Sequence, residues 1–163
     1  MRSLVELRIS MCRSLSDFPE EDCMGSLTQL RELDIGAFSE ELEDFPAGLV
    51  NSFQHPNLSG SLESLSIRGW DKLKSIPHQL QHLTALKNCI YGISTERNLR
   101  KLCRFLDIWS CKNLKHLPSS IAIQRLSKLE TLEISGCPLL EENCRKEKNG
   151  CEWPKISHIQ QSH

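Results

Sequence analysis

One pattern recurs along the whole chain. Leucine and isoleucine stand at fixed positions, and a cysteine or an aromatic residue follows them. The common form is L-x-x-L-x-I-x-x-[C/F/W], with another leucine six or seven residues beyond the isoleucine and, in the first four clear copies, a proline at the end. The clear copies occupy residues 4–19, 30–46, 62–77, 103–118 and 129–144, and a weaker copy fits at 86–92.

The spacing within each copy has a structural meaning. Its fourth and sixth positions are apolar and alternate with mostly polar neighbours, which is the period of a half-buried β-strand. The copies start 26, 32, 24, 17 and 26 residues apart, and leucine-rich repeats run about 20–29 residues. The predicted fold class is therefore α/β: a leucine-rich-repeat solenoid, or horseshoe, with a parallel β-sheet on the concave face and an irregular or short helical convex side.

Two steps depart from the repeat length. The 32-residue step contains the polar stretch at 51–61, which we interpret as a loop insertion. The 17-residue step is too short for a full coil and leaves the register of residues 86–103 open. We assign 1–144 to about six repeats, with the copy near 86–102 irregular, and 145–163 to a C-terminal capping tail.

The tail is predicted to close the last coil, because an open solenoid exposes the core of its final repeat. The stretch LEENCRKEKNG is polar enough to be a loop. After it, Trp153, Ile156 and Ile159 recur at three-residue spacing, and we expect them to form an apolar plug.

Five of the eight cysteines fit packing positions of the repeat. Cys12, Cys111 and Cys137 hold the ninth position, which points into the bend after the strand, and Cys89 and Cys103 replace core leucines. Buried cysteine behaves as a small hydrophobic residue. The N-terminus is not a signal peptide, so reduced thiols are expected rather than a disulfide framework. Cys23, Cys144 and Cys151 have no place in the pattern.

A metal site is the alternative for the tail, where Cys137, Cys144, Cys151 and His158 stand seven residues apart. Structural zinc sites favour C-x2–4-C pairs, because a short turn must aim two thiolates at one ion. This spacing lacks that geometry, and the repeat already accounts for Cys137, so we predict no metal. A second pair, His78 and His82, would share one helical face, but it has no third ligand.

Charge and hydropathy exclude some classes of partner. The 20 Lys and Arg balance the 21 Asp and Glu, and no block of five like charges occurs. A nucleic-acid or membrane-surface binder would show a basic patch. No apolar run is long enough to span a bilayer.

The residues that alternate with the core positions should face outward from the strands. No Ser–His–Asp set or Cys–His pair can be assembled from them, so we predict no catalytic residues and no enzyme activity. Asp107 and Glu133 lie on consecutive copies, and we interpret them as a solvated acidic face rather than an acid–base pair. The candidate binding residues on the predicted concave face are Glu32, Asp34, Ser64, Ser66, Arg68, Phe105, Asp107, Trp109, Thr131 and Glu133.

Phe105 and Trp109 are the strongest binding signal, because they flank a strand and should both point outward. Exposed aromatic residues on a rigid sheet are typical of binding hot spots. The alternative is that the connector or the irregular region at 93–102 folds over them.

Three features resemble the leucine-rich-repeat region of plant intracellular disease-resistance proteins, those with a nucleotide-binding module and typically a coiled-coil N-terminus. They are the copy LDIWSCKNLKHLP (106–118), the connector LPSSIAIQRLSKLETL (117–132) and the tail CPLLEENCRKEKNGCEWPKISHI (137–159). Cys151 departs from the family's tail, which usually has a polar residue there. The likeness covers most of the chain and is weaker at 20–60 and 86–103.

The resemblance implies a protein-recognition module of an immune receptor, which senses a pathogen-derived protein or restrains the receptor. Its partners would be a pathogen effector, a host protein that the receptor monitors, or the receptor's own nucleotide-binding module. The location would be the cytoplasm, with the nucleus or the inner face of the plasma membrane as alternatives. The parent receptor would bind ADP or ATP, but this chain has no G-x-x-x-x-G-K-[ST] loop, and we expect no cofactor in it. The alternative is a substrate adaptor of a ubiquitin ligase.

Overall fold

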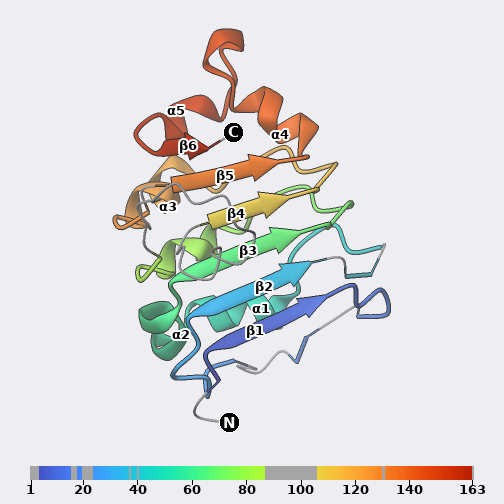
Figure 1. The fold of residues 1–163 in the computed structure, drawn as a ribbon, viewed down its shortest axis with the longest axis vertical. Helices are drawn as coiled ribbons and strands as arrows, with labels where there is room; N and C mark the ends of the chain where they lie inside the picture. Colours follow the sequence, from blue (N-terminus) through green and yellow to red (C-terminus); the bar gives the residue numbers. More distant parts are fainter. Residues whose placement is uncertain are drawn as a thin grey trace, which may run out of the picture.

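The structure is a computed structural model, which describes residues 4–15, 18–19, 24–36, 38–39, 41–86, 106–129 and 131–162, the last three by their backbone only. It is a mixed α/β architecture built on one parallel sheet whose strand order follows the sequence (Figure 1). The strands are β1 (Glu6–Ser10), β2 (Glu32–Gly36), β3 (Ser64–Arg68), β4 (Leu106–Trp109), β5 (Thr131–Ser135) and β6 (Gln160–Ser162).

The strands pair so that equivalent positions of the sequence copies lie next to each other. Leu7 pairs with Leu33, which pairs with Leu65, and the row continues through the later strands. The isoleucine of each copy forms a second row two residues further on. Both rows are almost fully buried from β2 to β4, because alternate residues of a strand point to the same face. The predicted parallel ribbon is confirmed for the described residues of the five clear copies.

A left-handed backbone conformation ends most of these strands. Met11, Gly69, Ser110 and Gly136 hold the same position of their copies, and all four have φ between 55° and 66°. Glycine adopts such angles without strain, whereas a side chain disfavours them. The shared turn sends the chain out of the sheet in the same direction after each strand.

The ninth residue of each copy packs in the bend that follows. Cys111 donates its backbone N–H to the sulfur of Cys137 at 3.3 Å, so these two bend cysteines stack on each other across neighbouring copies. In the earlier copies the ring of Phe38 meets that of Trp70 edge-on, with 4.9 Å between their centroids. The Trp70 indole N–H donates to the Leu42 carbonyl at 2.9 Å, so the larger side chains fill the same layer by aromatic contact.

Short helices carry the chain back to the next strand (Figure 1). They are α1 (Ala47–Phe53), α2 (Pro56–Ser61), the 3-10 helix η1 (His78–His82) and α3 (Ser120–Arg125). The repeated prolines stand where these helices begin: Pro46 precedes α1 and Pro77 precedes η1. Proline fixes φ and suits a helix start, where its missing N–H has no partner to lose.

The predicted loop insertion at 51–61 is wrong, because α1 and α2 occupy it. Pro56 starts α2, and the His55 ring accepts a hydrogen bond from the Asn57 backbone N–H. The side chains of Phe53 and Leu58 are completely buried. Two apolar anchors in an otherwise polar stretch are therefore enough to fasten two short helices to the core.

The C-terminal segment consists of α4 (Pro138–Asn143), the 3-10 helix η3 (Lys146–Lys148), α5 (Trp153–Ile156) and β6. Helical turns replace much of the loop predicted at 140–150. Ile156 and Ile159 are buried against the last repeat, whereas Trp153 is half-buried. Trp153 lines a cavity of about 640 Å³ together with Ile134 and Cys144. Its ring therefore borders the apolar core and is not enclosed by it.

Candidate functional site

The candidate site is the outward face of the sheet, formed by the residues of β1 to β5 that alternate with the core positions. Hydrogen-bonded pairing places them in rows across the strands: Arg8, Asp34, Ser66, Asp107 and Glu133 form the central row. Equivalent residues of neighbouring strands in a parallel sheet lie side by side, so this row forms one continuous surface.

Ion pairs connect this surface across four strands. Arg8 Nε lies 3.9 Å from Asp34 Oδ2, and Arg68 Nε lies 3.7 Å from Asp34 Oδ1. Arg68 also reaches β4, where its Nη2 lies 3.4 Å from Asp107 Oδ2. The charges thus alternate between basic and acidic along this ladder of Arg8, Asp34, Arg68 and Asp107.

Asp107 corrects the expectation of a solvated acidic face. Its exposure is 1%, and its Oδ2 accepts hydrogen bonds from Ser66 Oγ and Arg68 Nη2, both at 3.4 Å. A buried carboxylate requires such partners, because leaving water costs it several kcal/mol. Glu133 does lie beside it on β5, as predicted, and is half-exposed.

The outward face is less exposed than the alternation predicts. Gly36, Ser66 and Thr131 are buried, like Asp107. Glu32, Asp34, Ser64, Arg68, Trp109, Glu133 and Ser135 are half-buried, and the fully exposed positions lie on β1. Strand period alone says which face a residue occupies, but not how far its neighbours cover it.

Trp109 is the aromatic residue of this face that the structure describes. It is half-buried and pairs in register with Arg68 on β3 and Ser135 on β5. Phe105 lies outside the described residues, so the predicted aromatic pair has one described member.

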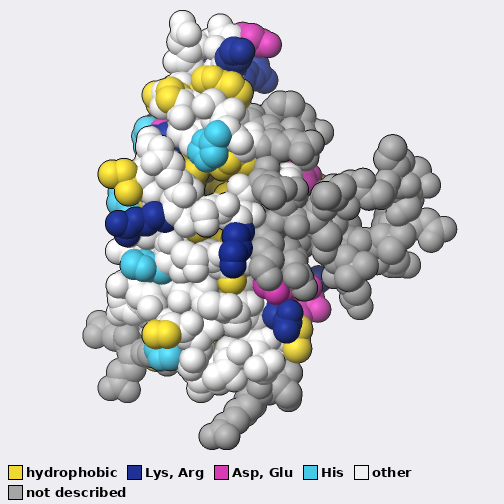
Figure 2. Space-filling view, turned by 90° about the vertical axis from the view of Figure 1, so that its left-hand side faces the viewer, with side chains coloured by type: hydrophobic (Ala, Val, Ile, Leu, Met, Phe, Trp, Pro, Cys, Tyr) yellow, Lys and Arg dark blue, Asp and Glu magenta, His cyan; other side chains and the backbone are white. Residues whose placement is uncertain are grey.

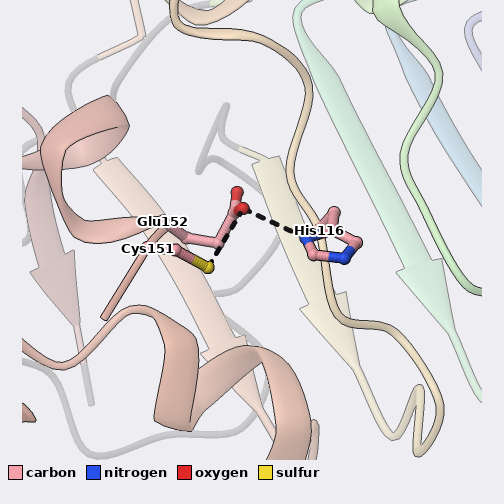
Figure 3. A group of neighbouring side chains, drawn as sticks. All are labelled: His116, Cys151 and Glu152. Carbon is pink, nitrogen blue, oxygen red and sulfur yellow. Dashed lines mark hydrogen bonds and ion pairs between the residues drawn. The ribbon is translucent and has the colours of Figure 1, made fainter. Parts of the chain in front are cut away.

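A second cluster joins the C-terminal segment to the residues that precede α3, and Figure 3 shows Glu152 lying between His116 and Cys151. Glu152 Oε1 is 3.2 Å from His116 Nδ1 and 3.8 Å from Cys151 Sγ. Its Oε2 accepts hydrogen bonds from the Leu117 backbone N–H at 2.9 Å and from Lys155 Nζ at 2.7 Å. Burial works to raise the pKa of Glu152, but these donors outweigh it and hold the pKa below its usual value.

This cluster was missed from the sequence because its members lie 35 and 36 residues apart. Among the described residues it is the group of His, Cys, Asp and Glu ligand atoms that lies within metal-binding distance. The spaced set of the tail does not form such a group. Cys137 and Cys144 are buried in the core, whereas Cys151 and His158 are exposed.

The buried thiols of Cys111 and Cys144 have the environment of packing residues. The hydrogen bond with Cys137 and burial together raise the pKa of Cys111, and burial raises the pKa of Cys144 to about 12. A reactive cysteine needs a lowered pKa and exposure. His78, from the other predicted pair, accepts a hydrogen bond from the Ser119 backbone N–H at 3.0 Å.

The side of the molecule shown in Figure 2 carries hydrophobic, basic and histidine side chains in small separate groups. Within the described part of the chain, no helix has the length and apolarity needed to cross a bilayer. No protein-family model matches the chain, and no curated protein matches it either.

Proposed function

We propose that this chain is a leucine-rich-repeat solenoid that recognises another protein, and that it forms the C-terminal repeat region of an intracellular plant immune receptor. The observation that supports the proposal most strongly is the register of the sheet, in which the clear sequence copies lie side by side residue for residue. Stacked repeats of this kind offer extended surfaces for binding proteins.

The outward face would make the contact. Its charges of both signs are held on rigid strands by the Arg8, Asp34, Arg68 and Asp107 ladder. Charge complementarity on such a surface selects partners and speeds their association. Trp109 adds the kind of side chain from which hot spots are built. The partner would be a pathogen effector, a monitored host protein or the receptor's own nucleotide-binding module.

Binding would act through a conformational equilibrium of the receptor in the cytoplasm. A partner that prefers one docking arrangement of the repeats shifts the population toward it by its difference in affinity. The chain would contribute the binding surface, and ADP or ATP would bind the nucleotide-binding module of the parent receptor.

The first test is the sequence of the transcript upstream of Met1. A G-x-x-x-x-G-K-[ST] loop in the same reading frame supports the receptor, whereas an F-box-like helical segment supports the ubiquitin-ligase adaptor. A transcript that encodes neither of these two features would contradict both assignments.

The second test uses isothermal titration calorimetry. It measures the affinity between this chain and the nucleotide-binding module that the upstream transcript would encode. We expect Trp109→Ala and Glu133→Lys to weaken binding at least about tenfold, or ~1.4 kcal/mol. Lys128→Glu, an exposed residue between α3 and β5, is the matched control. Equal affinities for all three variants, at unchanged melting temperature, would exclude the outward face as the contact surface.

A further inference from the structure

The cluster at the junction of cap and repeats has the composition of a transition-metal site. We propose that His116, Cys151 and Glu152 bind a zinc ion. The imidazole nitrogen, the thiolate sulfur and the carboxylate oxygen are the ligand types that zinc takes in proteins. His116 lies before α3 and the other two residues lie immediately before α5, so the ion would tie the cap to the preceding repeat.

Two of the three pairs of ligand atoms already stand at nearly the separations that a tetrahedral ion requires. Zinc–ligand bonds at tetrahedral angles place the nitrogen and oxygen about 3.4 Å apart, and the sulfur and oxygen about 3.6 Å apart. The observed separations are 3.2 Å between His116 Nδ1 and Glu152 Oε1, and 3.8 Å between Cys151 Sγ and the same oxygen. All three ligand atoms lie within 4.8 Å of one another. Binding would bring the nitrogen and the sulfur to about 3.6 Å from each other.

The surroundings of Glu152 leave one of its oxygens for the ion. Oε2 is held by the Leu117 backbone N–H and by Lys155, whereas Oε1 faces His116 and Cys151 (Figure 3). The Glu152 side chain is 3% exposed, so its orientation is fixed by packing. Hydrogen bonds that fix a ligating carboxylate from behind are typical of protein metal sites.

Charge and protons balance when the ion binds. The Cys151 thiol releases its proton to the buffer, and the His116 ring moves its proton through solvent from Nδ1, which donates to Glu152 Oε1 in the metal-free chain, to Nε2, so that Nδ1 offers a lone pair. One thiolate and one carboxylate then neutralise the two charges of the ion, while Lys155 stays on Oε2. His116 is 55% exposed at its side chain and Cys151 is exposed, so water can fill the fourth coordination position.

The test titrates the purified, reduced full chain with Zn²⁺ alone by isothermal titration calorimetry, and with Co²⁺ by absorption spectroscopy. We expect a one-to-one site, a thiolate-to-cobalt charge-transfer band, and about one proton released per ion when the titration is repeated in buffers of different ionisation enthalpy. Cys151→Ser and His116→Asn should each weaken zinc binding at least tenfold, or ~1.4 kcal/mol, and Cys151→Ser should abolish the band.

The controls are Cys12→Ser and His158→Asn, which change exposed residues of the same types outside the cluster. Both should bind like the wild type. Equal binding by Cys151→Ser and the wild type would overturn the proposal, and weakened binding by His158→Asn would move the site to the spaced cysteines of the tail. Cys151→Ser replaces an exposed thiol by a hydroxyl of similar size, and its metal-free melting curve establishes that the variant is folded.

Discussion

Glu152 brings a nearly buried carboxylate between two segments that the sequence separates widely. It accepts hydrogen bonds from the Leu117 backbone N–H and from Lys155, and it also contacts His116. We expect Glu152→Gln to lower the free energy of unfolding by about 3 kcal/mol, because a buried ion pair loses its charge and one donor loses its acceptor. Urea denaturation in the presence of a chelator measures this. Glu142→Gln, which removes an exposed partner of Lys148, is the control and should change the midpoint little.

We expect the exposed cysteines to react with alkylating reagents faster than the buried ones. Cys12 and Cys151 are exposed, whereas Cys111, Cys137 and Cys144 are buried free thiols. Burial raises the pKa of Cys144 to about 12, so little thiolate forms there at neutral pH. In timed labelling with iodoacetamide followed by peptide mass spectrometry, the two exposed residues should react before these three buried ones. Early modification of Cys144 would contradict its place in the core.

Across the strands, Arg68 contributes more than its exposure indicates, because it contacts Asp34 and Asp107 on both sides. Arg68→Ala removes one cation from the buried Asp107, and we expect a loss of roughly 2–3 kcal/mol in unfolding free energy. Arg8→Ala, at the exposed end of the same ladder, should cost less than about 1 kcal/mol. Thermal and urea melts of both variants compare the two. If Arg68→Ala and Arg8→Ala lowered the free energy of unfolding equally, the pairing of Arg68 with the buried Asp107 would add no stability.

In the C-terminal segment, the free energy of unfolding should depend on the isoleucines more than on the tryptophan. Ile156 is completely buried, and Ile156→Ala should cost about 2–5 kcal/mol. A fully buried Trp153 would cost about 3–5 kcal/mol on truncation, but its ring lines the cavity beside β5. We therefore expect Trp153→Ala to cost less than Ile156→Ala. The reverse order in chemical denaturation would show that the ring closes the core.

Periodicity predicted the strands and their pairing because every copy contains the same local alternation of leucine and isoleucine. It did not predict α2, whose helix depends on a proline and a histidine cap around the single buried Leu58. It also missed the burial of Asp107, which follows from contacts with Ser66 and Arg68 on the neighbouring strand. The Glu152 cluster is a contact between distant segments, and one sequence carries no signal for such a contact.

Among the described strands, β1 and β6 stand at the two ends of the sheet. The first strand is the less protected end among the described residues. Leu7 and Ile9 are half-buried there, whereas their counterparts on β2 to β4 are almost completely buried. Val5 and Met11 beside them are 48% and 83% exposed. A strand edge with free backbone groups and apolar side chains is a template for association.

We therefore predict that the isolated chain associates at high concentration through the outer edge of β1. Sedimentation velocity over a concentration series should show the mean sedimentation coefficient rising with concentration. Val5→Lys combined with Met11→Lys should reduce this rise, because charged side chains on an edge strand oppose pairing with another chain. Ile121→Lys, which places the same charge on the exposed large hydrophobic residue of α3, is the matched control and should associate like the wild type. A wild-type chain that sediments as a monomer throughout the series would show that the first repeat needs no further cover.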